Sequence, residues 1–252
     1  MLTTQRKKLI QDRLLQDGEV VAKSLSQEWG VSEDTIRRDL RELAQEGKLQ
    51  RVHGGALPAS KALATLDARQ HIAANDKQAL GRAGAAMVKP GQLVFLDGGT
   101  TALQLARHLD PALRATFVTH SPTVALELAS KPLLDIIMLG GTLYRHSMVN
   151  VGAAVVAAAA GFRADLYFMG VTGVHATAGL STGDFEEAAV KRALHAHAAE
   201  TIVLASTEKL GAASSYVVAA VRELAAVVLL PGVPADLMQG LEAAGTEVIV
   251  AG

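Results

Sequence analysis

The residues Asp97-Gly98-Gly99-Thr100-Thr101 have the composition of a loop that binds an anion. They follow the apolar run 93–96, which has the length of a buried strand, and they precede a helical pattern over 101–109. Glycines tolerate positive φ and let a ligand approach the backbone closely, and threonines add hydroxyl donors. Because free N–H groups and the helix dipole at a strand-to-helix turn favour negative charge, the loop predicts a phosphate site. A tight turn without a ligand is the alternative interpretation.

Residues that can complete a ligand site recur near the ends of other strand-like runs. Gly140-Gly141 follows one such run, and Glu187, Lys191 and Lys209 lie near a helix start and after a later strand. Because the carboxyl ends of parallel strands meet at one edge of a sheet, we expect these residues to gather around one crevice. Glu187 and Lys191 are also spaced i, i+4, as in an ordinary surface ion pair. The candidate ligand residues are Asp97, Gly98, Gly99, Thr100, Thr101, Gly140, Gly141, Glu187, Lys191 and Lys209.

A second group of candidate residues surrounds a short helix that begins after Ser32. Ser32 is a favourable N-cap, and Ile36, Leu40 and Leu43 form one apolar stripe. The other faces carry four polar residues: Thr35, Arg37, Arg38 and Arg41. Hydroxyl groups and guanidinium groups of this kind reach phosphates and base edges in the major groove of DNA. The helix therefore predicts a DNA-reading element, with an ordinary solvated surface helix as the alternative.

The neighbours of this helix predict a helix-turn-helix. Apolar residues at helical spacing over 9–15 indicate a first helix, and 21–29 indicates a second. A turn over 30–32, which contains a glycine, joins the second helix to the third. Two helices joined by such a short turn are typical of DNA-binding helix-turn-helix units.

A short β-hairpin follows the third helix and predicts the wing of a winged helix. The run 48–52 alternates at period two, and residues 53–56 have the composition of a turn. Arg51 and His53 on this wing can touch the DNA backbone or the minor groove. We therefore expect residues 1–57 to form a winged helix-turn-helix DNA-binding domain.

The remainder of the chain predicts an α/β domain. Residues 58–75 have a weak helical pattern and no strong apolar face, as in a partly helical linker, and the alanine- and valine-rich run 149–161 predicts a buried helix. From residue 76 on, buried strand-like runs alternate with helical patterns, which is typical of a mostly parallel, doubly wound sheet with helices on both faces. The expected strands are 93–96, 116–119, 136–139, 166–169, 201–204, 226–230 and 248–250.

The composition limits what kind of protein this chain can be. Half of the 252 residues are apolar and 19% are charged, which supports a sizeable core. The net charge is −1, and residues 1–57 carry ten Lys/Arg against nine Asp/Glu. DNA binding therefore has to depend on the local placement and orientation of the arginines, since the bulk charge provides no attraction. There is no cysteine, no metal-ligand spacing among the histidines, no signal-peptide pattern and no apolar run long enough to span a membrane. We therefore expect a cytoplasmic protein with no metal, no cofactor and no membrane partner.

Several motifs resemble those of the DeoR-type bacterial transcriptional regulators. In the first part of the chain these are Thr35-Ile36-Arg37-Arg38-Asp39-Leu40, Gly47-Lys48-Leu49 and Val52-His53-Gly54-Gly55-Ala56. In the rest they are Leu96-Asp97-Gly98-Gly99-Thr100-Thr101, Gly140-Gly141, Glu187-Ala188 with Lys191-Arg192, and Lys209-Leu210-Gly211. The motifs occur in the order and spacing of the family, so the resemblance covers almost the whole chain.

The resemblance implies an effector-binding and oligomerisation domain over 76–252. Its fold would be similar to that of ribose-5-phosphate isomerase and the CoA-transferases, and its ligand a phosphorylated sugar or a related metabolite. Double-stranded operator DNA and a homo-oligomer, a dimer or larger, are implied as well. Ser206 stands where the family usually has Asp, and His120 stands where it usually has Asn. The effector, the operator and the direction of regulation are left open.

Two functions are compatible with these residues. One is a transcriptional regulator, most often in this family a repressor of carbohydrate metabolism genes that a phosphorylated sugar releases or modulates. The other is a sugar-phosphate isomerase with an accessory DNA-binding module, in which Asp97, Glu187 and Lys209 supply a base and a cation for an enediolate. The complete winged helix and the missing acid at position 206 favour a regulator without catalytic residues. The near-neutral charge argues against a nonspecific nucleoid protein.

Overall fold

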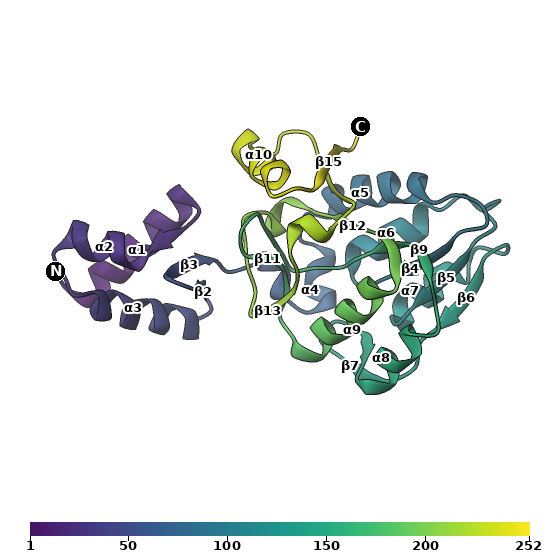
Figure 1. Cartoon of the computed structure of the whole chain (residues 1–252), viewed down its shortest axis with the longest axis horizontal. Helices are drawn as coiled ribbons and strands as arrows, with labels where there is room; N and C mark the ends of the chain where they lie inside the picture. Colours follow the sequence, from purple (N-terminus) through teal and green to yellow (C-terminus); the bar gives the residue numbers. More distant parts are fainter.

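The structure, a computed structural model, describes residues 1–252 and consists of two domains (Figure 1). A small N-terminal domain lies at one end of the molecule. The chain leaves it after strand β3 and enters a larger α/β domain, which holds the main sheet and the C-terminus. The predicted combination of a winged helix-turn-helix with a larger α/β domain is thus confirmed.

Three helices and a three-stranded antiparallel sheet make up the winged domain. The strands lie in the order β1-β3-β2, so the predicted hairpin of β2 and β3 gains one additional, unpredicted strand. The elements are α1 (Thr3–Asp17), β1 (Val20–Val21), α2 (Ala22–Trp29), α3 (Glu33–Gln45), β2 (Leu49–Val52) and β3 (Gly55–Pro58).

The predicted apolar stripe of α3 is the part of the helix that enters the core. Ile36, Leu40 and Leu43 are at most 2% exposed, and they pack against residues of α1 and α2. Ser32 caps the helix as expected, because its hydroxyl accepts from the Thr35 N–H at 3.2 Å. The buried stripe fixes which face of α3 is turned outward, and it leaves the arginines on that face.

A buried ion pair joins α1 to α3. Arg6 donates to both carboxylate oxygens of Asp39, from Nε to Oδ2 and from Nη2 to Oδ1 at 3.1 Å. The two side chains are 5% and 0% exposed. Removing two charges from water is costly, and the bidentate geometry offsets that cost. Asp39 therefore holds α3 against α1 and does not face outward with the neighbouring arginines.

Gly55 is required by the packing of β1 against the wing. A Cβ at this position would lie 1.9 Å from the carbonyl oxygen of Val20, so a larger residue would displace β1. Strand β3 begins at Gly55, and the turn of the wing is therefore the two residues His53 and Gly54, narrower than the predicted turn over 53–56. Gly54 has a φ of +80°, which glycine adopts without strain.

The segment that joins the two domains lies against the larger domain. The Ser60 hydroxyl donates to the backbone oxygen of Thr172, and the Leu66 N–H donates to that of His146 at 2.9 Å. The expected partly helical linker is therefore built into the surface of the second domain instead of crossing open solvent. Its two short helices are η1 (Lys61–Leu63) and α4 (Leu66–Gln70).

A seven-stranded sheet forms the centre of the larger domain. Its order is β15-β14-β12-β9-β4-β5-β6, and every neighbouring pair is parallel. Each strand expected from the apolar runs overlaps one of them, which confirms the parallel sheet. The strands are β4 (Leu93–Leu96), β5 (Thr116–Thr119), β6 (Asp135–Met138), β9 (Ala164–Phe168), β12 (Ala198–Leu204), β14 (Ala226–Leu229) and β15 (Glu247–Val250).

Helices cover both faces of this sheet. Alternate residues of β4 divide between two cores, with Val94 and Leu96 in one and Phe95 in the other. None of the helices combines the length and the apolar composition that crossing a membrane requires. The core that contains Val94 and Leu96 includes residues of α5 (Ala74–Met87), α6 (Thr100–His108) and α7 (Pro122–Leu128). The core that contains Phe95 includes residues of α8 (Ala153–Ala159), α9 (Phe185–Ala196) and α10 (Ala235–Ala243).

Short antiparallel strands extend the domain beyond the predicted sheet, and one of them corrects the expected helix over 149–161. Residues 149–151 form a strand, and the helix begins only at Ala153, after Gly152 with its φ of +101°. The strand exists because Asn150 pairs with Leu143, a tertiary contact that a local apolar pattern does not contain. The unpredicted elements are β7 (Thr142–Tyr144), β8 (Val149–Val151), β10 (Gly173–His175), β11 (Gly179–Thr182), η2 (Thr207–Lys209), β13 (Tyr216–Ala219) and η3 (Val221–Glu223).

We expect Asp39→Ala to destabilise the winged domain, because it leaves the Arg6 charge buried without a partner. The free energy of unfolding should fall by about 3–5 kcal/mol. Urea unfolding followed by the fluorescence of Trp29 measures it, since this is the single tryptophan of the chain and it lies in α2. Glu33→Ala is the matched control, because it removes only the exposed ion pair with Arg37 and should cost less than about 1 kcal/mol. Equal stabilities of the two variants would contradict this role of Asp39.

Candidate functional site

A cavity lies where the connections of the sheet change direction. The chain runs from β4 to one edge of the sheet through β5 and β6, and it reaches the other edge through β9, β12, β14 and β15. Open α/β sheets bind ligands beside such a switch point, at the carboxyl ends of the strands. The cavity there encloses about 680 Å³, a volume that includes the part open to solvent. The loop after β4 and Gly170 after β9 line it.

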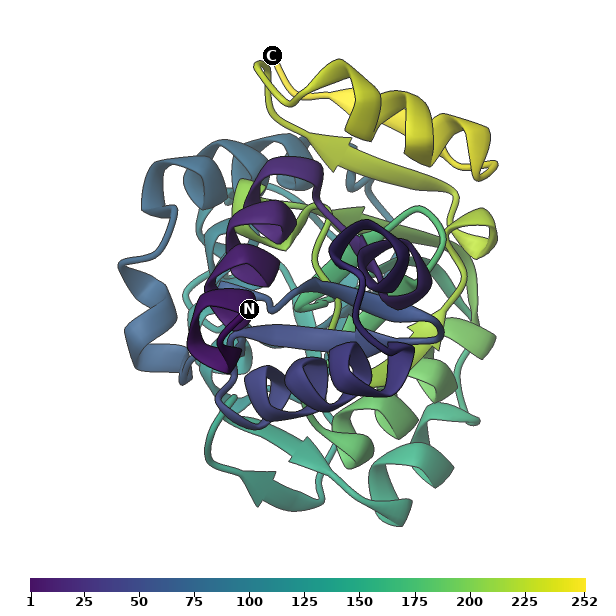
Figure 2. The ribbon, with the colours of Figure 1, turned by 90° about the vertical axis from the view of Figure 1, so that its left-hand side faces the viewer.

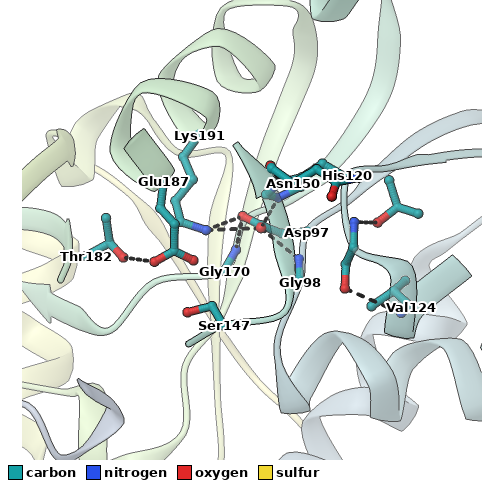
Figure 3. Close-up of polar contacts among 12 residues, drawn as sticks. Asp97, Gly98, His120, Val124, Ser147, Asn150, Gly170, Thr182, Glu187 and Lys191 are labelled. Carbon is teal, nitrogen blue, oxygen red and sulfur yellow. Dashed lines mark hydrogen bonds and ion pairs between the residues drawn. The ribbon is translucent and has the colours of Figure 1, made fainter. Parts of the chain in front are cut away.

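Asp97, the residue after β4, is the centre of a buried polar network (Figure 3). Its side chain is fully buried. Two backbone groups donate to the carboxylate, the N–H of Gly98 at 2.7 Å and the N–H of Gly170 at 2.9 Å. The Tyr167 hydroxyl donates to Oδ2 at 2.7 Å, and burial together with this carboxylate raises the pKa of Tyr167 well above its ordinary value. Asp97 thus ties the end of β4 to the end of β9.

Two side chains from other elements complete the network around Asp97. The Lys191 ammonium, on α9, donates to both carboxylate oxygens at 3.0 and 2.9 Å, and His120 Nε2, after β5, lies 2.8 Å from Oδ1. Burial alone would raise the pKa of Asp97, but Lys191 and His120 outweigh it and hold the pKa far below its usual range. The carboxylate is ionised and its acceptor capacity is used, and it lies behind the cavity wall. Asp97 was predicted to touch a ligand, and the structure instead assigns it to holding that wall.

His120 explains one departure from the family pattern. Its Nδ1 lies 2.7 Å from the backbone oxygen of Asn150, while Nε2 faces the carboxylate of Asp97. A histidine at this position therefore links the carboxylate of Asp97 to the backbone of β8 through its two ring nitrogens.

The loop from Gly98 to Thr101 presents free donors to the cavity. Gly99 has a φ of +111°, a conformation that side-chain-bearing residues rarely adopt, and it is the N-cap of α6. No hydrogen bond of the chain uses the backbone N–H groups of residues 99–102. The Thr101 hydroxyl is buried and has no hydrogen-bond partner. Free donors at the positive end of a helix suit an anion, and the phosphate site predicted for this loop stays a prediction.

The four cations that line the cavity divide into two kinds. Lys191 is held by Asp97, and Lys77 donates to the backbone oxygen of Arg69 at 2.8 Å and lies 3.5 Å from Glu208. Lys209 has no ion pair or hydrogen bond, and burial lowers its pKa to about 8. Arg69 makes one long hydrogen bond, from Nη2 to the Ser147 hydroxyl at 3.4 Å, and its Nε is buried without a partner. Lys209 and Arg69 are therefore the cations free to bind an anion.

The carboxylates of the cavity are also of two kinds. Glu187 accepts a long hydrogen bond from the Thr182 hydroxyl at 3.4 Å and has no ion pair, so the alternative interpretation of a surface ion pair with Lys191 is wrong. A carboxylate placed in this way can accept hydrogen bonds from ligand hydroxyl groups. Glu208 pairs with Lys77 and also accepts from the Ser206 hydroxyl at 2.8 Å. Ser206, the second departure from the family pattern, thus acts through Glu208.

The structure separates some residues that the sequence grouped together. Gly140 and Gly141 lie outside the cavity, and Gly141 is instead required by packing, since a Cβ there would lie 2.7 Å from the Val151 backbone oxygen. Arg69 and Lys77 do line the cavity and were not predicted. Arg69 lies in the segment interpreted as a linker, and its place beside the loop after β4 results from tertiary packing that no local pattern shows. No group of three or more His, Asp or Glu side chains is arranged to hold a metal ion.

The predicted DNA-binding residues lie on the surface of the winged domain. Figure 2 faces this domain and shows α3 beside the strands of the wing. Arg37 forms an exposed ion pair with Glu33 at 2.7 Å, whereas Arg38 and Arg41 have no ion-pair partner. The predicted residues are all exposed except the half-buried Thr35: Ser32, Thr35, Arg37, Arg38, Arg41, Arg51 and His53.

Asp97→Asn should strongly destabilise the larger domain, because Lys191 and His120 would be left buried without their anion. The free energy of unfolding should fall by about 3–5 kcal/mol near neutral pH. A lowered carboxyl pKa stabilises the native state above the unfolded-state pKa of about 3.9, and that contribution disappears as the pH falls below it. Calorimetry should therefore show the difference from wild type shrinking below about pH 4. The control is Asp236→Asn, at an exposed carboxylate without hydrogen bonds, and a similar destabilisation in both variants would contradict the role of Asp97.

The chain matches two protein families over most of its length. Residues 6–62 match the DeoR-like helix-turn-helix domain, and residues 72–229 match the DeoR C terminal sensor domain. The HTH-type transcriptional regulator GlpR of Haloferax volcanii is 32% identical over 99% of this chain and 98% of its own, and the repressor GlcR of Bacillus subtilis is 30% identical over 89% and 87%. Ribose 5-phosphate isomerase A of Methanocaldococcus jannaschii aligns over 54% of each chain, with a TM-score of 0.41 and 18% identity. The chain belongs to the DeoR family of transcriptional regulators.

Proposed function

We propose that this regulator represses carbohydrate metabolism genes by binding operator DNA, and that a phosphorylated sugar in the cavity of the larger domain modulates the binding. One observation carries the ligand class. The unpaired N–H groups of residues 99–102, the unpartnered Thr101 hydroxyl and the unpaired Lys209 ammonium line the same cavity. Free donors of this number, buried or half-buried, require an anionic group with several acceptor oxygens, such as a phosphate.

The remainder of the cavity suits a polyhydroxylated ligand. Glu187 supplies an acceptor, and the Thr172 and Thr182 hydroxyls and the Ser147 hydroxyl line the same space. Only six of the twenty lining residues are hydrophobic, so the cavity offers hydrogen bonds more than apolar contact. A sugar that carries a phosphate presents both kinds of group, whereas an unphosphorylated sugar would leave the donors of the loop without their anion.

The names of relatives support repression. GlcR of Bacillus subtilis and CsqR of Escherichia coli are each named a transcriptional repressor, and each is 30% identical to this chain over more than four fifths of it. In the proposed mechanism the ligand binds one arrangement of the two domains better than another, and this difference changes the affinity for the operator. Two half-sites are read by two winged helices, so we propose a homo-oligomer, a dimer or larger, that acts in the cytoplasm.

The network around Asp97 argues against the isomerase alternative. A catalytic base has to reach the substrate with a free lone pair. Asp97 is fully buried, and it accepts hydrogen bonds from Lys191, His120, Tyr167 and two backbone N–H groups. Of the two carboxylates that the isomerase hypothesis offers, Asp97 is thus occupied in holding the fold, and only Glu187 is left to act as a base. We therefore propose that the chain is not an enzyme.

We expect Arg38→Ala and Arg41→Ala to weaken operator binding without unfolding the chain, because both side chains are exposed and unpaired. For every phosphate that the variant no longer neutralises, the slope of log K against log salt should become shallower by about 0.9. Titration of a DNA fragment obtained by selection for binding, at several salt concentrations, measures the slope. The matched control is Arg82→Ala, at an exposed arginine of α5 in the larger domain. Wild-type slopes for both α3 variants would show that α3 is not the recognition helix.

A sugar phosphate of the right structure should raise the melting temperature, and the same sugar without phosphate should not. Saturation to 100 times the Kd would add about 2.7 kcal/mol to the free energy of unfolding. In Gly99→Val the stabilisation should disappear, because a side chain at φ +111° strains the loop and covers its N–H groups. Operator binding should stay near the wild-type level, since the winged domain is unchanged.

The control for this variant is Gly91→Val, which places the same strained side chain at φ +83° in a turn outside the cavity. If the sugar phosphate also failed to stabilise Gly91→Val, the effect would come from general damage to the domain. The same samples test for catalysis. Conversion of the stabilising sugar phosphate at about 1 per second or faster would contradict the proposal that the chain is not an enzyme.

A further inference from the structure

Arg69 reaches the cavity from the segment that joins the two domains. It lies on α4, and its Nη1 is beside Gly99, 3.9 Å from the position that a Cβ would occupy there. The guanidinium therefore lies next to the free N–H groups of the loop after β4. No other residue of α4 lines the cavity.

This guanidinium is short of partners. Its Nε is buried without a hydrogen bond, its hydrogen bond with the Ser147 hydroxyl is 3.4 Å long, and it has no ion pair. Burial lowers the pKa of Arg69, although Glu187 and Asp97 act against this effect. Arg69 is half-buried, and a cation that is partly removed from water is stabilised by an anion. A planar guanidinium binds phosphate or carboxylate through two parallel hydrogen bonds. The Arg69 guanidinium has no anionic partner within the protein, and an anionic ligand can supply one.

The segment that carries Arg69 continues directly from the wing. Pro58 ends β3, and its backbone oxygen accepts from the Ala213 N–H at 3.3 Å. From there to Arg69 the segment is attached to the larger domain by hydrogen bonds from Ser60 to Thr172, between Leu66 and His146, and between His146 Nε2 and the Leu63 oxygen at 2.9 Å. Lys77 donates to the backbone oxygen of Arg69 itself. Thr172 itself lines the cavity. A change in the position of α4 is thus transmitted along a short stretch of chain to the wing.

We infer that Arg69 binds the anionic group of the effector together with the neighbouring 99–102 amides, and that segment 59–72 thereby transmits occupancy of the cavity to the winged domain. This inference rests on the proposed function, because it assumes that the cavity binds an anion. The inference adds Arg69 as a binding residue outside residues 72–229, which match the sensor domain, and it gives the joining segment a role in regulation. A static brace between the domains would need neither an unpaired guanidinium nor its place in the cavity.

Hydrogen exchange of the full chain, with inorganic phosphate as the probe and chloride at equal ionic strength as the reference, tests the inference. In the wild type, phosphate should slow exchange both at amides 99–103 and over 61–72. In Arg69→Met, phosphate should bind about 10- to 100-fold more weakly, as expected for the removal of one or two charge-assisted hydrogen bonds. At saturation it should still protect 99–103 and no longer protect 61–72.

Two further variants make the result specific to the guanidinium. Arg69→Lys keeps a charge without the planar fork and should retain part of the affinity and of the protection over 61–72. Lys61→Met removes an exposed cation of the same segment that does not line the cavity, and it should behave as wild type. Arg69→Met with wild-type affinity and wild-type protection over 61–72 would overturn the inference and leave the proposed function intact. Phosphate that protects neither region of the wild type would overturn both.

Discussion

The burial of one negative charge organises the larger domain. The Asp97 carboxylate lies at the carboxyl end of strand β4, beside the central strand β9, and its side chain is fully buried. An ionised group in such a place is stable only when charges and hydrogen bonds from the protein replace its hydration. The replacements come from α9, from the end of β5 and from the end of β9, through Lys191, His120 and Tyr167. Satisfying this charge therefore brings together the elements that form the cavity wall.

The same constraint separates structural from ligand-binding charges. Lys191 and Lys77 are used inside the protein, by Asp97 and by Glu208, so they are not free for a ligand. Lys209 and Arg69 have no such anion, and the amides of residues 99–102 have no acceptor. A site whose donors stay free binds anions well, and Asp97, whose oxygens are already occupied, cannot take a proton from a ligand. This division fits a sensor better than a catalyst.

Local patterns predicted the elements of the fold, and long-range packing determined the parts that they missed. The stripe of Ile36, Leu40 and Leu43 and the cap at Ser32 define α3 within its own sequence, and the apolar runs define the strands of the parallel sheet. The glycine loop after β4 was predicted as a candidate anion site from its own residues, because glycines, threonines and a helix start follow an apolar strand there. The role of Asp97 depends on its contact with Lys191, which is 94 positions away in the sequence. The place of Arg69 depends on its contact with Ser147, which is 78 positions away. Periodicity contains no information about such contacts.

The division of the cavity between two parts of the chain bears on how a ligand could act on DNA binding. A ligand shifts an equilibrium only by the difference in its affinity for the two states. The amides of residues 99–102 belong to an element that the Asp97 network fixes, so they contribute nearly the same binding energy in every arrangement of the domains. Arg69 belongs to the segment that leads to the wing, and its guanidinium makes one long hydrogen bond, to Ser147. The rigid part therefore supplies affinity, and the difference in affinity between two domain arrangements has to come from the segment that carries Arg69.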